Sequence, residues 1–134
     1  MLACGLALAA CNQTTGSGPQ AAAPLPSDYR EQIIAKVRDT FFDPYSIRDA
    51  SISQPIAGAA FAGPVSTVCI RANAKNRMGG YIGLKQTSFT FRDGKLTVAD
   101  SEYAAMTCGQ AVYEPFPEIE EGYKPAAAAP KIRR

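Results

Sequence analysis

The stretch FTFRDGKLTV, residues 89–98, carries the clearest information about the fold. Apolar and polar residues alternate on both sides of Asp93-Gly94, a dipeptide typical of the two-residue turn of a β-hairpin. In this register the facing apolar pairs are Phe91 with Leu96 and Phe89 with Val98, all on one face of the hairpin. Cross-strand pairs of this kind stabilise an antiparallel sheet. The sequence therefore predicts a hairpin with one buried face.

The neighbouring segments carry weaker strand signals. Residues 65–70, VSTVCI, are rich in β-branched side chains and predict a strand. Residues 48–53 form a short, mixed segment. Residues 55–64, PIAGAAFAGP, are apolar but interrupted by Gly and Pro, so we predict a loop there. The strand that leaves the Asp-Gly turn is expected to continue toward Met106.

A helix is predicted over residues 28–41. Ser27 or Asp28 can serve as the N-cap, and Glu31 lies three positions after Asp28, as in a capping box. Apolar residues then follow at helical spacing, which predicts one apolar face; they are Tyr29, Ile33, Ile34, Val37 and Phe41. The helix should end at Asp43-Pro44, because the residue before a proline disfavours the α conformation.

These signals predict a fold of the α+β class, in which one N-terminal helix packs on a small antiparallel β-sheet between flexible termini. We assign the globular domain to residues 27–113. Residues 11–26 are rich in Gly, Pro, Ala and Gln and predict a flexible linker. Residues 114–134 have little means of building a core and predict a disordered tail.

The first ten residues, MLACGLALAA, are apolar and uncharged. A helix needs about 20 apolar residues to cross a bilayer, so this run is too short for a transmembrane span. Its length and its small-residue end match the core of a signal peptide. No Lys or Arg precedes it, as signal peptides normally have, so we expect a start codon upstream or a trimmed chain. The alternative is a buried N-terminal helix that contains a chance cysteine.

The tetrapeptide Leu8-Ala9-Ala10-Cys11 resembles the lipobox of bacterial lipoproteins. The resemblance implies that residues 1–10 are removed and that the Cys11 thiol carries diacylglycerol, so the membrane is a partner through this lipid. Two or more acyl chains hold a protein stably at a bilayer, whereas one does not. Asn12 follows where Asp would favour retention in the inner membrane. The resemblance therefore implies an outer-membrane protein that faces the periplasm.

Once Cys4 leaves with the signal peptide and Cys11 is acylated, Cys69 and Cys108 remain. An even pair in an oxidising compartment predicts a disulfide bond. The closed loop of about 40 residues corresponds to a stabilisation of about 4 kcal/mol in the loop-entropy relation. A two-cysteine metal site and a redox pair are alternatives, but the chain has no His and no CxxC spacing to support them.

Composition limits the functions that we expect. The 134 residues have a net charge of only +2 and include no His. Neither Ser–His nor Cys–His catalysis is therefore possible, although a Ser/Lys arrangement stays open. The candidate carboxylates are scattered along the chain at Asp43, Asp49, Asp100 and Glu102. We predict a protein without enzymatic activity, cofactor or metal, and without a nucleic-acid partner.

Basic charge is concentrated in residues 71–95, where six Lys and Arg residues oppose only Asp93, a net charge of +5. Within this segment lies NAKNRMGGYIG, residues 73–83, whose Asn and Gly residues suit turns. It is not a P-loop, because no Gly-Lys-Ser/Thr closes it. We predict that Lys75, Arg77 and Tyr81 contact a partner. The alternative is a plain connector with solvated charges.

The NAKNRMGGYIG segment after a cysteine-bearing strand is similar to a pattern in a family of small bacterial envelope proteins. In that family the segment also follows a helix that ends in a DP-containing sequence, matched here by Asp43-Pro44-Tyr45-Ser46. The resemblance spans residues 28–91. It implies a fold group and no catalytic activity.

Three functions fit these features. The first is a non-catalytic, lipid-anchored envelope lipoprotein that presents a small binding domain to another envelope component, a protein or a glycan. The second is an accessory subunit that stabilises an outer-membrane or secretion complex, with residues 114–134 folding on the partner. The third is an inhibitor of a periplasmic hydrolase of the lysozyme kind.

Overall fold

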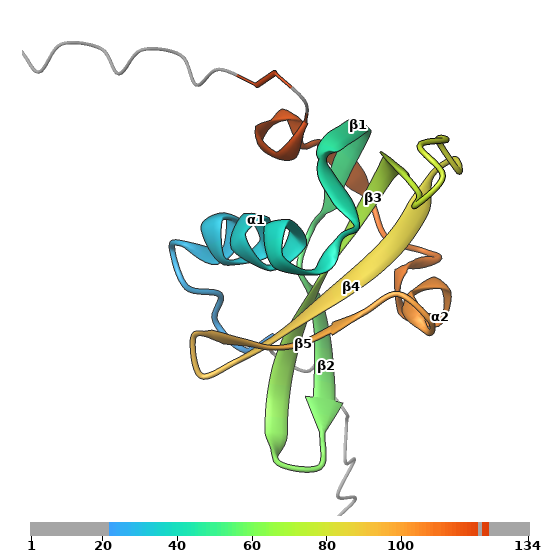
Figure 1. The fold of residues 1–134 in the computed structure, drawn as a ribbon. Helices are drawn as coiled ribbons and strands as arrows, with labels where there is room; N and C mark the ends of the chain where they lie inside the picture. The colour runs from blue at the N-terminus through green and yellow to red at the C-terminus, as the bar shows by residue number, and fades with distance from the viewer. Residues whose placement is uncertain (1–21, 121, 124–134) are drawn as a thin grey trace, which may run out of the picture.

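The computed structural model describes residues 22–120, 122 and 123, which form an antiparallel sheet of six strands with two α-helices (Figure 1). In chain order the elements are α1 (Tyr29–Thr40), β1 (Asp43–Ser53), β2 (Ile56–Ala60), β3 (Gly63–Lys75), β4 (Lys85–Arg92), β5 (Lys95–Asp100), α2 (Ala104–Cys108), β6 (Tyr113–Pro115) and the 3₁₀ helix η1 (Pro117–Ile119). The strand order is β5-β4-β3-β1-β6, and β2 pairs with β3. The predicted combination of antiparallel sheet, helix and disulfide is confirmed at this level.

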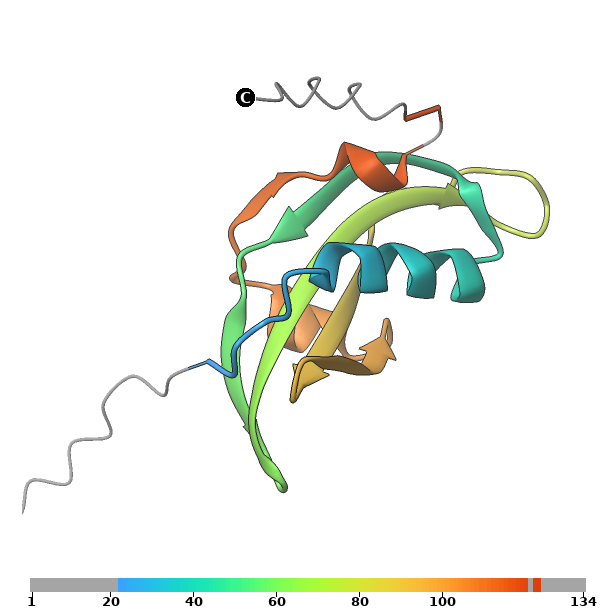
Figure 2. The same cartoon turned by 90° about the vertical axis from the view of Figure 1, so that its left-hand side faces the viewer.

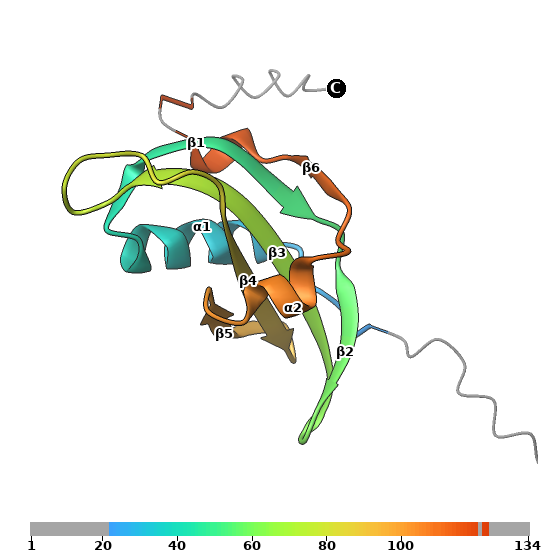
Figure 3. The same ribbon diagram turned by 90° about the vertical axis from the view of Figure 1, so that its right-hand side faces the viewer.

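Strand β3 is the centre of the sheet, because β1, β2 and β4 all pair with it (Figure 2). Val68 and Ile70 face the main core beneath α1, and Cys69 faces a smaller cluster with α2 (Figure 3). A strand alternates its side chains between the two faces of a sheet, so a strand covered on both faces reads as a continuous apolar run. This accounts for the apolar run Val68-Cys69-Ile70.

Helix α1 forms over nearly the predicted residues and buries the predicted face. Ile33 and Val37 have no exposed surface. The other predicted residues that pack against this core are Tyr29, Ile34 and Phe41. The predicted capping box is wrong, because the Asp28 side chain makes no cap and instead accepts a hydrogen bond from the Gln32 amide at 3.1 Å.

The predicted Asp-Gly turn joins β4 to β5, and its two central residues have φ values of 50° and 74°, as this turn requires. The pair of Phe91 with Leu96 is confirmed. Phe89 lies opposite Ala99 rather than Val98, because the register shifts by one residue before Phe91. Val98 is consequently 52% exposed instead of sharing the buried face.

The predicted loop over residues 55–64 is wrong. Ile56–Ala60 form β2, which pairs antiparallel with the first part of β3. Gly63 follows the turn with a φ of 117°, a conformation that suits glycine. The apolar run is therefore a hairpin whose glycine serves the turn.

The predicted tail begins too early in the chain. Tyr113–Pro115 pair with β1, and the side chains of Phe116 and Ile119 are fully buried in the main core. The Glu120 carboxylate accepts a hydrogen bond from the Ala50 backbone N–H, at an irregularity in β1. The domain therefore extends at least to residue 120 instead of ending at residue 113.

Arg30 of α1 holds this C-terminal segment through ion pairs with Glu114 and Glu118. Burial alone would lower the pKa of Arg30, but its interactions with Tyr29 and the two carboxylates raise it above the ordinary value. The two ends of the described chain are thus joined by paired charges as well as by apolar packing.

The predicted disulfide between Cys69 and Cys108 is present. It ties α2 to the face of β3 opposite α1. The expectation that the strand after the Asp-Gly turn continues toward Met106 is wrong, because β5 ends at Asp100 and Met106 lies in α2.

Several predictions lie outside the described residues, namely the signal peptide over residues 1–10, the acylated Cys11, the linker up to residue 21 and the tail from residue 124. Residues 22–26 of the predicted linker belong to the domain instead. Leu25 packs against the main core, and the Ala23 carbonyl accepts a hydrogen bond from the Ser66 hydroxyl. In the part of the chain that the structure describes, no helix is long and apolar enough to span a bilayer.

Candidate functional site

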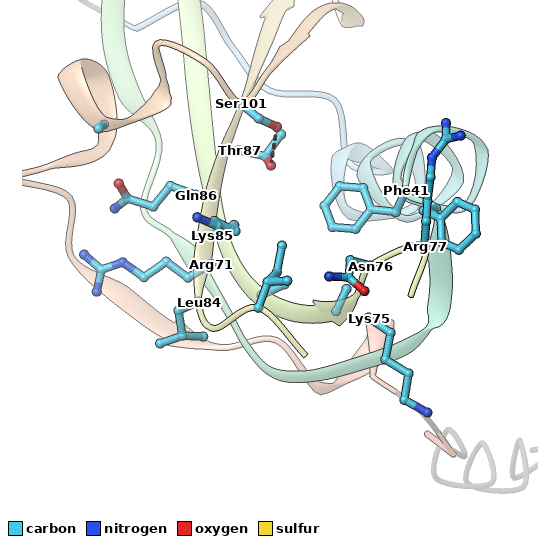
Figure 4. Close-up of a pocket in the computed structure, with 15 residues that line it drawn as sticks. Phe41, Arg71, Lys75, Asn76, Arg77, Leu84, Lys85, Gln86, Thr87 and Ser101 are labelled. Carbon is cyan, nitrogen blue, oxygen red and sulfur yellow. Dashed lines mark hydrogen bonds between the residues drawn. The ribbon is translucent and has the colours of Figure 1, made fainter. Parts of the chain in front are cut away.

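A groove of about 740 Å³ lies beyond the C-terminal end of α1, beside the loop of residues 76–84 (Figure 4). Its lining comes from the α1–β1 junction, the end of β3, this loop and the start of β4, with Ser101 and Ala105 at one side. The groove therefore collects residues from distant parts of the sequence at one end of the sheet.

The floor of the groove exists because small side chains replace large ones along β3. Val68 and Ile70 fill the core beneath α1, whereas Ala72 and Ala74 continue the same face into the groove. Helix α1 ends at Thr40 and does not cover this part of the sheet. The floor is consequently apolar and shallowly covered, with Ala72 buried and Ala74 partly exposed.

The walls of the groove expose large apolar side chains. Phe41 and Phe42 form one side, and Ile82 and Leu84 come from the loop. Phe42 is 63% exposed and Leu84 is 58% exposed. Clustered apolar exposure of this kind on a small domain marks an interaction site.

The loop of residues 76–84 is shaped by its own asparagines. The Asn76 side-chain oxygen accepts hydrogen bonds from the Met78 and Gly80 backbone N–H groups at 2.9 and 3.2 Å. The Asn73 side-chain oxygen accepts another from Gly83 at 3.0 Å. The predicted positive φ is found at Gly79 and Gly83, whereas the asparagines act through their side chains. These hydrogen bonds fix the loop from which two apolar wall residues project.

Four basic residues line the groove, and they are Arg71, Lys75, Arg77 and Lys85. The Arg77 guanidinium lies 5.5 Å from the centre of the Phe42 ring, and exposed Lys85 lines the other side. Arg71 also borders the groove, but its guanidinium stacks on Tyr113 at 3.8 Å. No Asp or Glu lines the groove. Its apolar surface is therefore combined with positive charge alone.

Of the three predicted contact residues, two line the groove and the third, Tyr81, pairs with one of them, Lys75. Lys75 and Arg77 both line the groove. The Lys75 ammonium lies 5.5 Å from the centre of the Tyr81 ring and is directed away from the groove in Figure 4. Tyr81 is half-buried and donates a hydrogen bond from its hydroxyl to the Ser46 carbonyl at 3.0 Å. Its ring also lies 3.5 Å from the Arg48 guanidinium. Tyr81 thus attaches the loop to β1.

The residues that sequence reasoning missed are the apolar ones and Lys85. Ile82 and Leu84 follow a Gly- and Asn-rich turn, where large apolar side chains are unusual, and this was the available signal. Phe42 offered no signal, because it continues the apolar pattern of the helix. Only the fold brings it next to the loop.

The chemistry of this site suits binding. The closest polar pair at the groove is Thr87 with Ser101, whose hydroxyls are 2.9 Å apart and bonded to each other (Figure 4). Within residues 22–120, 122 and 123, no three His, Cys, Asp or Glu side chains gather in a way that could hold a metal ion. The groove offers apolar contact and cationic donors.

Comparison with known proteins gives no relative from which a role could be transferred. The chain matches no protein-family model, no curated protein and no solved structure.

Proposed function

We propose that this chain is a non-catalytic lipoprotein of the bacterial outer membrane, anchored by lipid on Cys11. It holds a small α+β domain in the periplasm and uses the groove beside residues 76–84 to bind another envelope component, a protein or a glycan. The lipobox-like Leu8-Ala9-Ala10-Cys11 supports the anchor. The groove supports the binding role.

The observation that carries the binding role is the combination of an apolar floor with positive charge and no carboxylate. A partner that fits it presents an apolar group next to an anionic group. The apolar part would cover Phe42 and Leu84, and each such side chain contributes about 1.5–3 kcal/mol when it goes from exposed to buried. The anionic part would meet Arg77 and Lys85. Because these cations are exposed, their contribution should weaken as salt rises.

Site-specific photo-crosslinking in cells tests this proposal. A photoreactive residue replaces Leu84 in the groove, and a matched control replaces Val98, which is similarly exposed on β5. We expect discrete adducts from position 84 and few from position 98. The double variant Arg77→Glu, Lys85→Glu should reduce the adducts from position 84 severalfold, because it reverses two of the four positive charges that line the groove.

The charge-reversal result also separates a specific partner from random encounters. Adducts from position 84 that match those from position 98, or that survive charge reversal unchanged, would contradict the groove as the binding site. Mass spectrometry of the adducts identifies the partner as a protein or a glycan. Both variants alter exposed side chains, so circular dichroism should show an unchanged fold.

A further inference from the structure

The hairpin of β2 and β3 projects beyond the rest of the sheet. Strand β4 pairs with β3 only from Ser66 onward, so at the tip β2 and the start of β3 pair only with each other. Figures 2 and 3 show this hairpin extending away from both helices. A two-stranded ribbon of this kind is only marginally stable in water on its own.

The projecting hairpin is apolar and uncharged. No charged residue occurs between Asp49 and Arg71, so both strands of the ribbon lack the Lys and Glu side chains that usually protect exposed edges. Its turn carries Phe61, whose side chain is fully exposed at 112%. Alanines surround it, which leaves Phe61 as the one large apolar group at the tip.

The start of the described chain lies beside the same hairpin. The Ala23 side chain is buried, and its carbonyl accepts a hydrogen bond from Ser66, near the base of the projecting part. Ten residues lie between Cys11 and residue 22, so the eleven Cα–Cα steps span at most roughly 40 Å. The projecting part of the hairpin has three residue pairs and is about 10 Å long, at 3.4 Å for each residue. A lipid on Cys11 can therefore enter a bilayer that the tip of the hairpin also touches.

We propose that the β2–β3 hairpin is a second membrane contact, with Phe61 inserted at the interface of the bilayer that holds the lipid anchor. This inference rests on the anchored state in the proposed function. The uncovered edges of the ribbon limit how deeply the hairpin can enter the bilayer, because unpaired backbone N–H and C=O groups are costly in hydrocarbon. The aromatic tip therefore lies at the boundary between headgroups and acyl chains, and the ribbon stays among the headgroups.

This contact would orient the whole domain. The loop of residues 76–84 and the hairpin tip lie at opposite ends of the sheet in both Figure 2 and Figure 3. With Phe61 in the bilayer interface, the groove faces away from this membrane. Two points of attachment, the lipid and the hairpin, would then hold the groove toward partners in the periplasm.

Tryptophan fluorescence tests the contact directly, because the chain contains no Trp. The full-length chain with Cys4→Ser is coupled through Cys11 to a maleimide-headgroup lipid in phosphatidylcholine vesicles. Phe61→Trp is the reporter. Met78→Trp is the matched control, because Met78 is 93% exposed and lies in the loop at the opposite end. We expect the Phe61→Trp emission to shift to shorter wavelength and to be quenched by lipids brominated near the headgroup.

The control should keep its aqueous emission and resist this quenching. Aqueous emission from both reporters would overturn the proposal, and so would a blue shift of both, because the domain would then have a different orientation. A shift of the Phe61→Trp emission that is already present without vesicles, together with a dimeric mass, would mean that the hairpin pairs with a second copy. That result also overturns the proposal.

A second measurement uses the chain without a tether, as Cys11→Ser. We expect Phe61→Ser to weaken its partitioning into phosphatidylcholine vesicles about tenfold, because a buried Phe side chain is lost. Met78→Ser should leave partitioning unchanged, and equal effects of the two variants would contradict the proposal. In the first experiment the lipid is attached chemically, so the result does not depend on whether cells acylate Cys11. A missing membrane contact at Phe61 would therefore contradict the hairpin proposal without contradicting the lipid anchor.

Discussion

The two hairpins of this domain differ in whether a helix covers them. The β4–β5 hairpin alternates apolar and polar residues, and α1 covers its face so that Phe89 and Phe91 are fully buried. The β2–β3 hairpin has no such alternation at its tip, and neither helix covers it (Figure 1). Its only aromatic residue, Phe61, is fully exposed.

The difference teaches that periodicity in a sequence reports burial on one face. A strand that packs on a helix must separate apolar from polar residues, and this leaves a readable pattern. The tip of a ribbon that no helix covers has no reason to alternate. Such a hairpin is available for another surface, which is the reason for our inference about the membrane.

The largest difference in stability between the two hairpins should appear when one aromatic side chain is truncated in each. Phe91→Ala removes a fully buried ring and should lower the free energy of unfolding by about 3–5 kcal/mol. Phe61→Ala should change it by less than about 0.5 kcal/mol, because the ring has no contact to lose. Urea denaturation of the two variants measures both values. A large loss of unfolding free energy in Phe61→Ala would show that the β2–β3 tip packs against another part of the domain. The contrast between a covered and an uncovered hairpin would then be wrong.

A smaller effect should come from adding a methyl group at each turn. Gly94 has a φ of 74° and Gly63 a φ of 117°, and an added Cβ meets no close neighbour at either position. Gly94→Ala should lower the free energy of unfolding by about 1–2 kcal/mol, because the L side chain is strained there. Gly63→Ala should cost less than about 0.5 kcal/mol, because the uncovered tip can open locally without unfolding the core.

Thermal denaturation of the two glycine variants measures this contrast. Equal losses would mean that the β2–β3 tip is as tightly coupled to the core as the β4–β5 turn. The comparison between a covered and an uncovered hairpin would then be wrong, although the positions of the strands would stand.

Much of the fold could be predicted, and the failures have local causes. The helix, the Asp-Gly turn, the strand around Cys69 and the disulfide followed from periodicity, turn chemistry and cysteine count. The register beyond Phe91 could not be predicted, because a shift inside a strand has no sequence signature here. Phe116 and Ile119 were assigned to a tail, because they are separated by Pro and Glu and show no period. Only contact with β1 and α1 buries them.

The candidate site was less accessible to prediction than the fold. Arg77 was identified from the charge around it, but the groove needs Phe42, Leu84 and Lys85 as well, and tertiary structure alone brings these together. Tyr81 was predicted to contact a partner, and its hydroxyl is bonded to the Ser46 carbonyl. A turn-rich basic segment therefore indicated the region, and the fold determined which side chains face the solvent together.

The most direct test of the whole account is the intact mass of the protein purified from membranes of the cells that produce it. We predict a chain that begins at Cys11 and carries two or three acyl groups, and cleavage of the ester-linked chains should remove two of them and leave the thioether-linked glyceryl group. A chain that keeps residues 1–10 and has no lipid on Cys11 would contradict the anchor, and the roles assigned to the groove and to the hairpin at a membrane would lose their basis.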